Sequence, residues 1–388
     1  MDQALRSVLG QPNVNWAYSG EDGYAFQVLC RTQLRMSADR IQVCILFEDT
    51  RSVLLPLLQY SGRRFHYAFS GSGTRRYFPL TDGCAPAACA GRLLELLQWS
   101  GMSREELGKV HAYLEFLFTL DRLHYPRRTP GLQVIEAYAG NAAVEMALAT
   151  LMDRGTVDLT ARDRLLERYA EVRGAGPMLE NALALLEQTF SLHSPIQQRI
   201  ASSRVGDCVC VVIPTAFTDI QVLQLFRLLS WDIEAAVGTG KPVALSVFEG
   251  HRQYDDGLLR LLRWINGNAQ LSFFSKDAFA AHPASWQEEV RRYFQAWVFS
   301  RHSSMESCGA VSNLFGSMPV VHNTYGRDYD RRVGSNRLID ILLHTNRVDH
   351  VACQAPVWEP RYRKEEIYSM PSGVCLAQAA SVQGWVQL

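Results

Sequence analysis

Five short runs of apolar and β-branched residues divide the chain and predict buried strands. Each run has four to eight residues and is almost continuously apolar, which is typical of strands buried on both faces of a parallel sheet. Between two of them, the segment Thr218–Val237 repeats its apolar residues with a period near 3.6. Strand, helix and strand in this order predict a parallel α/β fold. The five runs cover residues 42–48, 64–69, 207–214, 242–249 and 269–275.

The middle of the chain follows a helical pattern instead. Between about Pro86 and Ile200 we expect no strand, and four segments have helical spacing. Ser103 and Glu106 form a capping box at the start of one helix, and another is expected to open at Thr160. We therefore predict a discontinuous α/β core, residues 1–85 and 201–388, interrupted by an all-α domain of residues 86–200.

The remaining apolar runs are too short to span a membrane. The longest, such as Ser52–Leu58 and Cys208–Ile213, have the length of a strand or a buried turn, so no transmembrane helix is expected. The first residues lack the basic start and long apolar stretch of a signal peptide. A cytoplasmic protein is therefore expected.

The charge balance gives no support for a dedicated DNA-binding protein, and the cysteine pattern gives none for disulfides or a metal site. Lys plus Arg and Asp plus Glu both total 39, so the formal net charge is zero, and tight non-specific DNA binding would need a local basic patch. The nine cysteines form no C-x-x-C pair, and we interpret them as reduced, mostly buried thiols with no disulfide or metal site. Cys208 and Cys210 would face the same side of a strand.

The segment GTGKP, residues 238–242, contains letters of a phosphate-binding loop. A P-loop has the pattern G-x-x-x-x-G-K-[ST] and joins a strand to a following helix. Here the first glycine position is Ala235, and the hydroxyl position is Pro242, which has no N–H to donate. A helix also precedes the segment and a strand follows it. The pattern therefore predicts a turn that ends a helix and opens a strand.

A better-placed candidate loop lies near the start of the α/β core. It contains Gly20 and Gly23 and precedes an amphipathic segment with helical spacing. However, Tyr24 stands where the lysine should be, and Ala25 stands where Ser or Thr should hold magnesium. Two acids also lie between the glycines, where they would repel phosphate. The loop is either a bare turn or a decayed P-loop.

The order of the other segments favours the decayed P-loop. The residues Tyr77–Leu80 (YFPL) precede the helical region, and residues 365–373 (EEIYSMPSG) lie near the end of the chain. Together with the loop and the strands, this order resembles the type IV coupling proteins, the hexameric DNA-pump ATPases of conjugation and type IV secretion. The resemblance runs from about residue 15 and implies a RecA-like core of the P-loop NTPase type with an inserted all-α domain.

The sequence departs from that family at each nucleotide motif. The Asp-Pro-Lys-Gly element is replaced by residues 48–51 (EDTR), and the Walker B Asp-Glu is replaced by Phe248 and Glu249. The sensor glutamine position holds Ser275 or Lys276, and the usual N-terminal membrane helices are absent. Losing the phosphate clamp, the magnesium support and the sensor together predicts a pseudo-ATPase without a cofactor.

The resemblance also implies partners and a place of action. The expected partners are proteins of a conjugation or secretion complex, including an active coupling ATPase, at the inner face of the bacterial inner membrane. Nucleic-acid binding has little support, because acids are interspersed with the arginine pairs. Oligomeric state is left open.

Other interpretations stay open at the level of sequence. Glu249 could be a remnant catalytic base, although a polar strand end explains it as well. The glycine-rich segment 70–76 could cradle an anion or form a surface loop. The alternatives for the whole protein are an active translocation motor with an unconventional site, a Rossmann-like enzyme and a DNA-binding accessory.

Overall fold

The structure is a computed structural model of the full 388-residue chain. It describes residues 3–11, 13–48, 51–59, 64–69, 85–126, 133–190, 200–249, 255–277, 282–320, 323–327, 349–353, 357–379 and 382–388.

A nine-stranded sheet forms the centre of the protein, in the order β13-β12-β7-β1-β6-β5-β2-β4-β3. The seven strands from β7 to β3 are parallel, and β12 and β13 extend the sheet as an antiparallel hairpin. The bounds are β1 Trp16–Ser19, β2 Ile41–Phe47, β3 Phe65–Phe69, β4 Cys208–Ile213, β5 Val243–Phe248, β6 Gln270–Ser275, β7 Ala296–Phe299, β12 Val374–Ala379 and β13 Val382–Gln387. The five predicted strands are β2 to β6.

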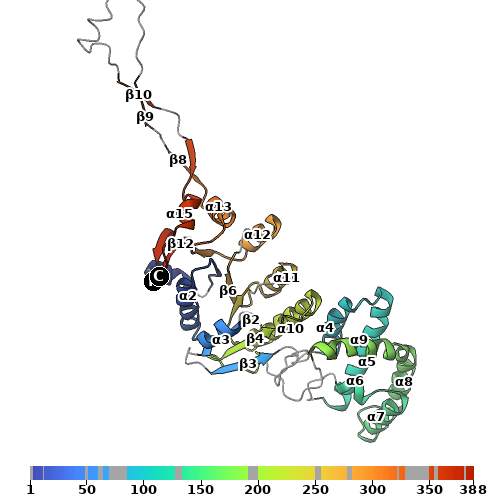
Figure 1. Ribbon diagram of the computed structural model, residues 1–388. Helices are drawn as coiled ribbons and strands as arrows, with labels where there is room; N and C mark the ends of the chain where they lie inside the picture. The colour runs from blue at the N-terminus through green and yellow to red at the C-terminus, as the bar shows by residue number, and fades with distance from the viewer. Residues whose placement is uncertain are drawn as a thin grey trace, which may run out of the picture.

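Helices cover both faces of this sheet (Figure 1). Alternate residues of each strand point to opposite faces, so Val43 and Ile45 of β2 join one core while Cys44 and Leu46 join the other. The second core is closed by α1 Gln3–Leu9, α2 Gly23–Met36 and α3 Arg51–Gln59. The first is closed by α10 Asp219–Gly238, α11 Asp255–Ile265, α12 Ala284–Arg291, α13 Met305–Leu314 and α15 Lys364–Tyr368.

The helical region lies between β3 and β4 in the chain and beside the sheet in space (Figure 1). Its helices are α4 Pro86–Leu97, α5 Arg104–His124, α6 Gln133–Ala137, α7 Asn141–Asp153, α8 Leu159–Val172 and α9 Gly176–Phe190, with short 3₁₀ turns at Gln98–Ser100 and Arg173–Ala175. The predicted α/β fold class is confirmed: the sheet is mostly parallel, and helices α4 to α9 are inserted between β3 and β4. The predicted domain boundaries stay predictions.

Two local predictions in this part of the chain have different outcomes. The capping box is confirmed: Ser103 accepts a hydrogen bond from the Glu106 amide, and the Glu106 carboxylate accepts one from the Ser103 amide. The expected start at Thr160 is wrong, because α8 is capped by Asp158, whose carboxylate accepts from the Ala161 amide. Both residues can cap a helix, and the sequence alone did not decide between them.

Contacts between charged and aromatic side chains join α4 to α10 and α11. Arg227 of α10 forms an ion pair with Glu95 of α4 at 2.7 Å. The Arg227 guanidinium lies over the rings of Trp231 and Trp264, 4.9 and 4.7 Å from their centroids. Gln224 adds a hydrogen bond to the Leu96 carbonyl at 3.0 Å. These contacts attach helix α4 of the helical insertion to helices α10 and α11 of the core.

The apolar run Ser52–Leu58, interpreted as a strand or a buried turn, is part of helix α3. Leu54 and Leu58 are four residues apart, so they lie on one face of the helix, and both are buried against the sheet. A run this short has no periodicity that separates a helix from a strand.

A narrow ribbon extends away from the body of the protein (Figure 1). Strand β8 Ser317–Val320 pairs with β11 Val357–Pro360, and β9 Asn323–Arg327 pairs with β10 Asp349–Cys353, both antiparallel. Most side chains of β8 and β11 are exposed.

Within the part of the chain that the structure describes, no helix is long and apolar enough to cross a bilayer.

Candidate functional site

The candidate site lies at the carboxyl edge of the sheet, where β1, β5, β6 and β7 end side by side. Ser19 at the end of β1 is in register with Ser275 of β6 and Phe299 of β7, and Phe248 of β5 is in register with Phe274 of β6. In parallel α/β sheets, ligands bind outside this edge. The edge brings together the candidate P-loop, the Walker B position and the sensor position of the sequence analysis. Their residues are Gly20, Gly23, Tyr24, Ala25, Phe248, Glu249, Ser275 and Lys276.

Gly20 sits where the loop after β1 passes very close to the loop after β7. Its φ is +150°, a conformation that favours glycine, and a Cβ placed there would lie 2.0 Å from the Ser300 hydroxyl oxygen. The Gly20 amide donates to the Ser275 carbonyl at 3.1 Å. The Ser300 hydroxyl in turn lies 2.8 Å from the Tyr18 hydroxyl. Neighbouring strand ends therefore fix the loop tightly.

Asp22 occupies the amino end of helix α2, where a P-loop would hold phosphate. Its carboxylate caps the helix by accepting a hydrogen bond from the Tyr24 amide at 3.0 Å. The same carboxylate accepts from the Ser372 hydroxyl at 2.9 Å and from the Gly373 amide at 2.7 Å. Burial alone would raise the pKa of Asp22, but hydrogen bonds from Gly373, Ser372 and the backbone of α2 hold the pKa below its usual value. A fixed negative charge therefore stands at this position.

The residues in place of the P-loop lysine and hydroxyl face different surroundings. The Tyr24 side chain is about half exposed, and its ring lies against Gly373, with ring carbons 3.2 and 3.3 Å from a Cβ built there. Ala25 is fully buried in the core beneath α2. Gly23 is the first residue of α2, and no atom lies within 4 Å of a Cβ built there. The three residues supply no cation to bind a phosphate and no hydroxyl to bind magnesium.

Phe248, in place of a magnesium-binding aspartate, belongs to an aromatic cluster under α2. Its ring stacks on Phe274 with centroids 4.7 Å apart and meets Phe26 of α2 edge-on at 6.1 Å. Phe26 and Phe274 also contact each other. Aromatic pairs of this kind stabilise a core beyond their buried area. The space beneath the loop is thus filled by hydrocarbon.

Glu249 follows Phe248 and is held by two neighbours. The Ser275 hydroxyl donates to one carboxylate oxygen, and the His282 Nε2 lies 3.0 Å from the other. The His282 ring stacks on Trp286 of α12 at 3.8 Å. Lys276, the other residue proposed for the sensor position, is exposed. Ser275 is therefore the residue of this pair that faces the site.

A second set of polar side chains at this edge was missed from the sequence. The Ser303 hydroxyl donates to Glu21 at 2.9 Å, and the Ser307 hydroxyl donates to Asp277. His302 is buried, with its Nε2 3.5 Å from the Ser19 hydroxyl. Burial lowers the pKa of His302, while the nearby Asp277 and Glu21 charges act in the opposite direction. The signal that could have located them is the strand end at residue 299, followed by a serine-rich run.

The GTGKP segment lies at the opposite edge of the sheet, as the sequence predicted for a turn. Helix α10 ends at Gly238, Gly240 adopts a φ of +79°, and β5 begins at Val243. The Lys241 ammonium donates to the carbonyls of Ala201 and Ser203. The ammonium group thus donates to backbone carbonyls just before β4, far from the carboxyl ends of the strands.

Three further predictions fall partly or wholly outside the described residues. The glycine-rich segment 70–76 and the YFPL element, Tyr77–Leu80, lie there entirely. Of the segment EDTR, residues 48–51, Glu48 is described: its carboxylate accepts hydrogen bonds from the amide and hydroxyl of Thr215, at 3.0 and 3.3 Å. The strand ends of β2 and β4 are joined in this way.

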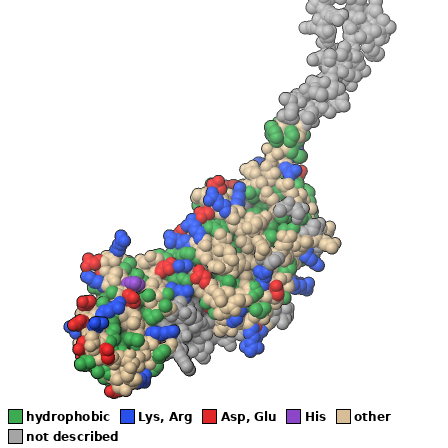
Figure 2. Space-filling model, turned by 180° about the vertical axis from the view of Figure 1, so that it is seen from behind, with side chains coloured by type: hydrophobic (Ala, Val, Ile, Leu, Met, Phe, Trp, Pro, Cys, Tyr) green, Lys and Arg blue, Asp and Glu red, His purple; other side chains and the backbone are tan. Residues whose placement is uncertain are grey.

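The described side chains at this edge differ from those of a P-loop nucleotide site. Besides the exposed Lys276, the side chains named above at this edge are acids, hydroxyls, imidazoles and aromatic rings, and the helix end that would bind phosphate carries Asp22. Among the described residues, the one group of at least three His, Cys, Asp or Glu placed to share an ion is elsewhere, at Cys44, Cys208 and Cys210. The face drawn in Figure 2 mixes Lys and Arg with Asp and Glu, so it presents no single basic stripe for nucleic acid.

Similar proteins were found among solved structures. The chain is similar to the bacterial conjugative coupling protein TrwBdeltaN70, with 12% identity, 96% of this chain and 84% of that chain covered, and a TM-score of 0.48. It is also similar to VirB4 of Thermoanaerobacter pseudethanolicus, with 11% identity, 96% and 89% covered, and a TM-score of 0.49. The neighbours thus include a protein of the coupling-protein family that the motif order resembles. No protein-family model and no curated protein matches.

Proposed function

We propose that this protein is a catalytically inactive, coupling-protein-like subunit with a structural or adaptor role in a conjugation or type IV secretion apparatus. The order of the sequence motifs supports the link to such an apparatus. The solved structures to which the chain is similar include a bacterial conjugative coupling protein, TrwBdeltaN70, and VirB4 of Thermoanaerobacter pseudethanolicus.

The observation that carries catalytic inactivity is the Asp22 carboxylate at the start of α2. A helix start attracts phosphate because its free amides and dipole favour negative charge. Here a carboxylate of the chain already accepts from the Tyr24 amide and is held by Ser372 and Gly373. A nucleotide phosphate would have to displace it or approach against its charge.

The surrounding substitutions support the same conclusion. Restoring one missing group would leave the others absent, since Tyr24, Ala25 and Phe248 lie in three different environments: half exposed, fully buried, and inside an aromatic cluster. Phosphoryl transfer depends on positioned charges rather than on covalent chemistry by the protein. An active site of this type is therefore not assembled from the residues at this edge.

The test is titration calorimetry of the full chain with magnesium-ATP at concentrations up to millimolar, the upper range of typical enzyme affinities, together with a hydrolysis assay. We expect neither binding heat nor turnover. A Lys241→Met variant is the matched control. A clear binding isotherm of the wild type would refute the proposed inactivity, and its loss in this variant would place the nucleotide on the GTGKP turn.

The adaptor role needs a separate measurement. The tagged chain is expressed in its native host, cross-linked and purified, and the proteins that accompany it are identified by mass spectrometry. We expect components of a secretion or conjugation complex, among them an active ATPase. Recovery of DNA without such proteins would support a DNA-binding accessory instead, and turnover that appears only with DNA and a partner would support a motor.

A further inference from the structure

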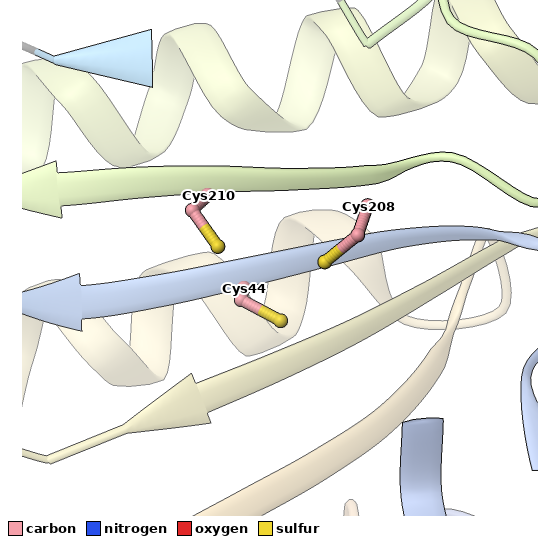
Figure 3. A group of neighbouring side chains, drawn as sticks. All are labelled: Cys44, Cys208 and Cys210. Carbon is pink, nitrogen blue, oxygen red and sulfur yellow. The ribbon is translucent and has the colours of Figure 1, made fainter. Parts of the chain in front are cut away.

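Three cysteines from two adjacent strands converge on one face of the sheet (Figure 3). Cys208 and Cys210 stand two residues apart on β4 and face one side of the sheet, and Cys44 of β2 is in register with Cys210. Their sulfur atoms all lie within 4.8 Å of one another. All three residues are fully buried. Parallel strands hold the three sulfur atoms without help from a loop.

The surroundings keep these groups neutral. Cys44, Cys208 and Cys210 belong to the apolar core that includes Leu54 and Leu58 of α3. Burial raises the pKa of Cys44 and Cys210 well above the usual value. The groups that act on the Cys44 thiol besides burial are the other two cysteines and Gln42, whose amide donates to the Cys44 sulfur at 3.8 Å.

We propose that Cys44, Cys208 and Cys210 form a three-sulfur binding site for a trivalent, thiol-seeking metalloid of the arsenic(III) type. Thiolate sulfur selects soft ions. With bonds of about 2.3 Å to each sulfur, the length of a zinc–sulfur bond, the sulfurs of a pyramidal three-coordinate centre lie roughly 3.5 Å apart. The three sulfur atoms already lie within 4.8 Å of one another, so side-chain rotation would bring them to this spacing.

Charge decides between the possible ligands. Three thiolates carry three negative charges, so a monovalent ion would leave two uncompensated and a divalent ion would leave one. An unpaired charge in an apolar core is very costly. A trivalent centre gives a neutral complex, and three-coordinate geometry suits it, whereas structural zinc takes four ligands.

The reaction balances without any redox partner. Arsenous acid, As(OH)₃, enters as a neutral molecule and meets three neutral thiols. Three arsenic–sulfur bonds form and three arsenic–oxygen bonds break, while each thiol proton leaves with one hydroxide as water. Arsenic stays trivalent and sulfur keeps its oxidation state. No charged species has to enter the core at any stage, which suits thiols whose ionisation is suppressed.

The experiment is incubation of the reduced full-length chain with arsenous acid, followed by native mass spectrometry and arsenic X-ray absorption. We expect one arsenic bound per chain, coordinated by three sulfur atoms, and a higher melting temperature than without arsenic. A centre with fewer than three sulfur ligands, or no bound arsenic, would overturn the proposal. These readouts use the wild-type protein and do not depend on any variant folding.

Variants then assign the site. Cys44→Ala and Cys210→Val should lose the three-sulfur signal and the rise in melting temperature. The matched controls are Cys30→Ala and Cys375→Ala, because both cysteines are buried in the same core outside the cluster, and Cys84→Ser and Cys353→Ser cover other parts of the chain. Each control should bind like the wild type. Three-sulfur binding that survives Cys44→Ala and disappears in a control would refute the assignment.

Discussion

Two glycine loops of this protein invite comparison, because one has the letters of a phosphate loop and the other has its place. The GTGKP segment contains glycine and lysine in the right order, yet it joins a helix to a strand at the amino edge of β5. The loop from Gly20 to Gly23 joins β1 to α2 at the carboxyl edge, yet it contains acids and is followed by tyrosine and alanine. Neither loop combines both requirements.

The difference teaches that a phosphate site depends on the chain direction around it as much as on residue types. A helix start presents free amides, whereas a helix end presents carbonyls. Lys241 donates to the carbonyls of Ala201 and Ser203 before β4, whereas Asp22 accepts from the Tyr24 amide at the start of α2 and from Ser372 and Gly373 just before β12. Each charged side chain already has partners in the protein, and these contacts compete with any ligand.

The largest expected loss of stability comes from adding a side chain at Gly20, and the same change at Gly240 of the other loop should cost less. Gly20→Ala should lower the free energy of unfolding by roughly 4 kcal/mol, because the new methyl would overlap Ser300 and the backbone conformation disfavours a side chain. Gly240→Ala should cost only about 1 kcal/mol, since its φ is positive but no atom lies within 4 Å. Urea denaturation of both variants measures the difference. Equal losses would contradict the close approach at Gly20.

Removing the carboxylate of Asp22 should have the next largest effect. Asp22→Ala is expected to cost about 2 kcal/mol, from the lost helix cap and the unpaired Gly373 amide. Asp22→Asn keeps a capping oxygen and should lose less. Hydrogen exchange of the Gly373 amide, followed by NMR or mass spectrometry, reports the local contact. Unchanged protection of that amide in Asp22→Ala would show that the contact does not hold the loop.

Lys241→Met tests the structural role of the GTGKP turn. The variant keeps the aliphatic stem and loses the hydrogen bonds to the carbonyls of Ala201 and Ser203, so we expect a loss of about 1 kcal/mol. Helix α10 should keep its length, because its end is set by Gly240. Chemical denaturation and far-UV circular dichroism provide the two measurements. A variant as stable as the wild type would mean that the lysine bonds contribute nothing.

The smallest expected effect concerns pH at the candidate site. Burial holds the pKa of His302 below its ordinary value of 6.5, so its contribution to stability is complete above pH 6.5 and declines as the pH falls through the lowered value. In His302→Gln this decline should be smaller. His124 of α5 also has a pKa lowered by burial, so the variant should keep part of the acid sensitivity. Thermal melts between neutral and mildly acidic pH test this.

The sequence allowed much of the sheet to be predicted, and the missing parts have a physical explanation. Strands β2 and β4 have five or more consecutive apolar residues, and β3, β5 and β6 are five- or six-residue segments that combine apolar and aromatic residues with one to three polar ones. β1 and β7 have four residues each, WAYS and AWVF, which are too short to show a pattern. β12 and β13 contain alanine, glutamine and glycine, because a hairpin at the edge of a sheet needs less apolar surface.

At the candidate site, the sequence located the residues but not their contacts. Tyr24, Ala25 and Phe248 were found by their positions in the nucleotide motifs. Asp22 was interpreted only as a repelling charge, although an aspartate before a helix is also a good cap. Its bonds to Ser372 and Gly373 join positions 350 and 351 residues apart. No local pattern contains that information.

The cysteines illustrate the same limit. Their interpretation as buried thiols is confirmed for the seven cysteines whose side chains the structure describes, and the spacing of Cys208 and Cys210 placed them on one face. Cys44 joins them only because β2 pairs with β4, although more than 150 residues separate these strands in the chain. The expectation that the chain holds no metal stays untested, and the three-sulfur site adds a direct way to test it.

The position of β1 at the centre of the sheet has a consequence for how the protein is made. Trp16–Ser19 pairs only with β6 and β7, which end at Ser275 and Phe299. A ribosome therefore releases this apolar strand long before it synthesises either neighbour, and the hydrogen bond from the Gly373 amide to Asp22 forms only after Gly373 has emerged. Non-local pairing of this kind slows folding and leaves apolar segments open to aggregation. A chain whose synthesis stops before residue 270 could fold its helical insertion but would leave the first strand without a partner.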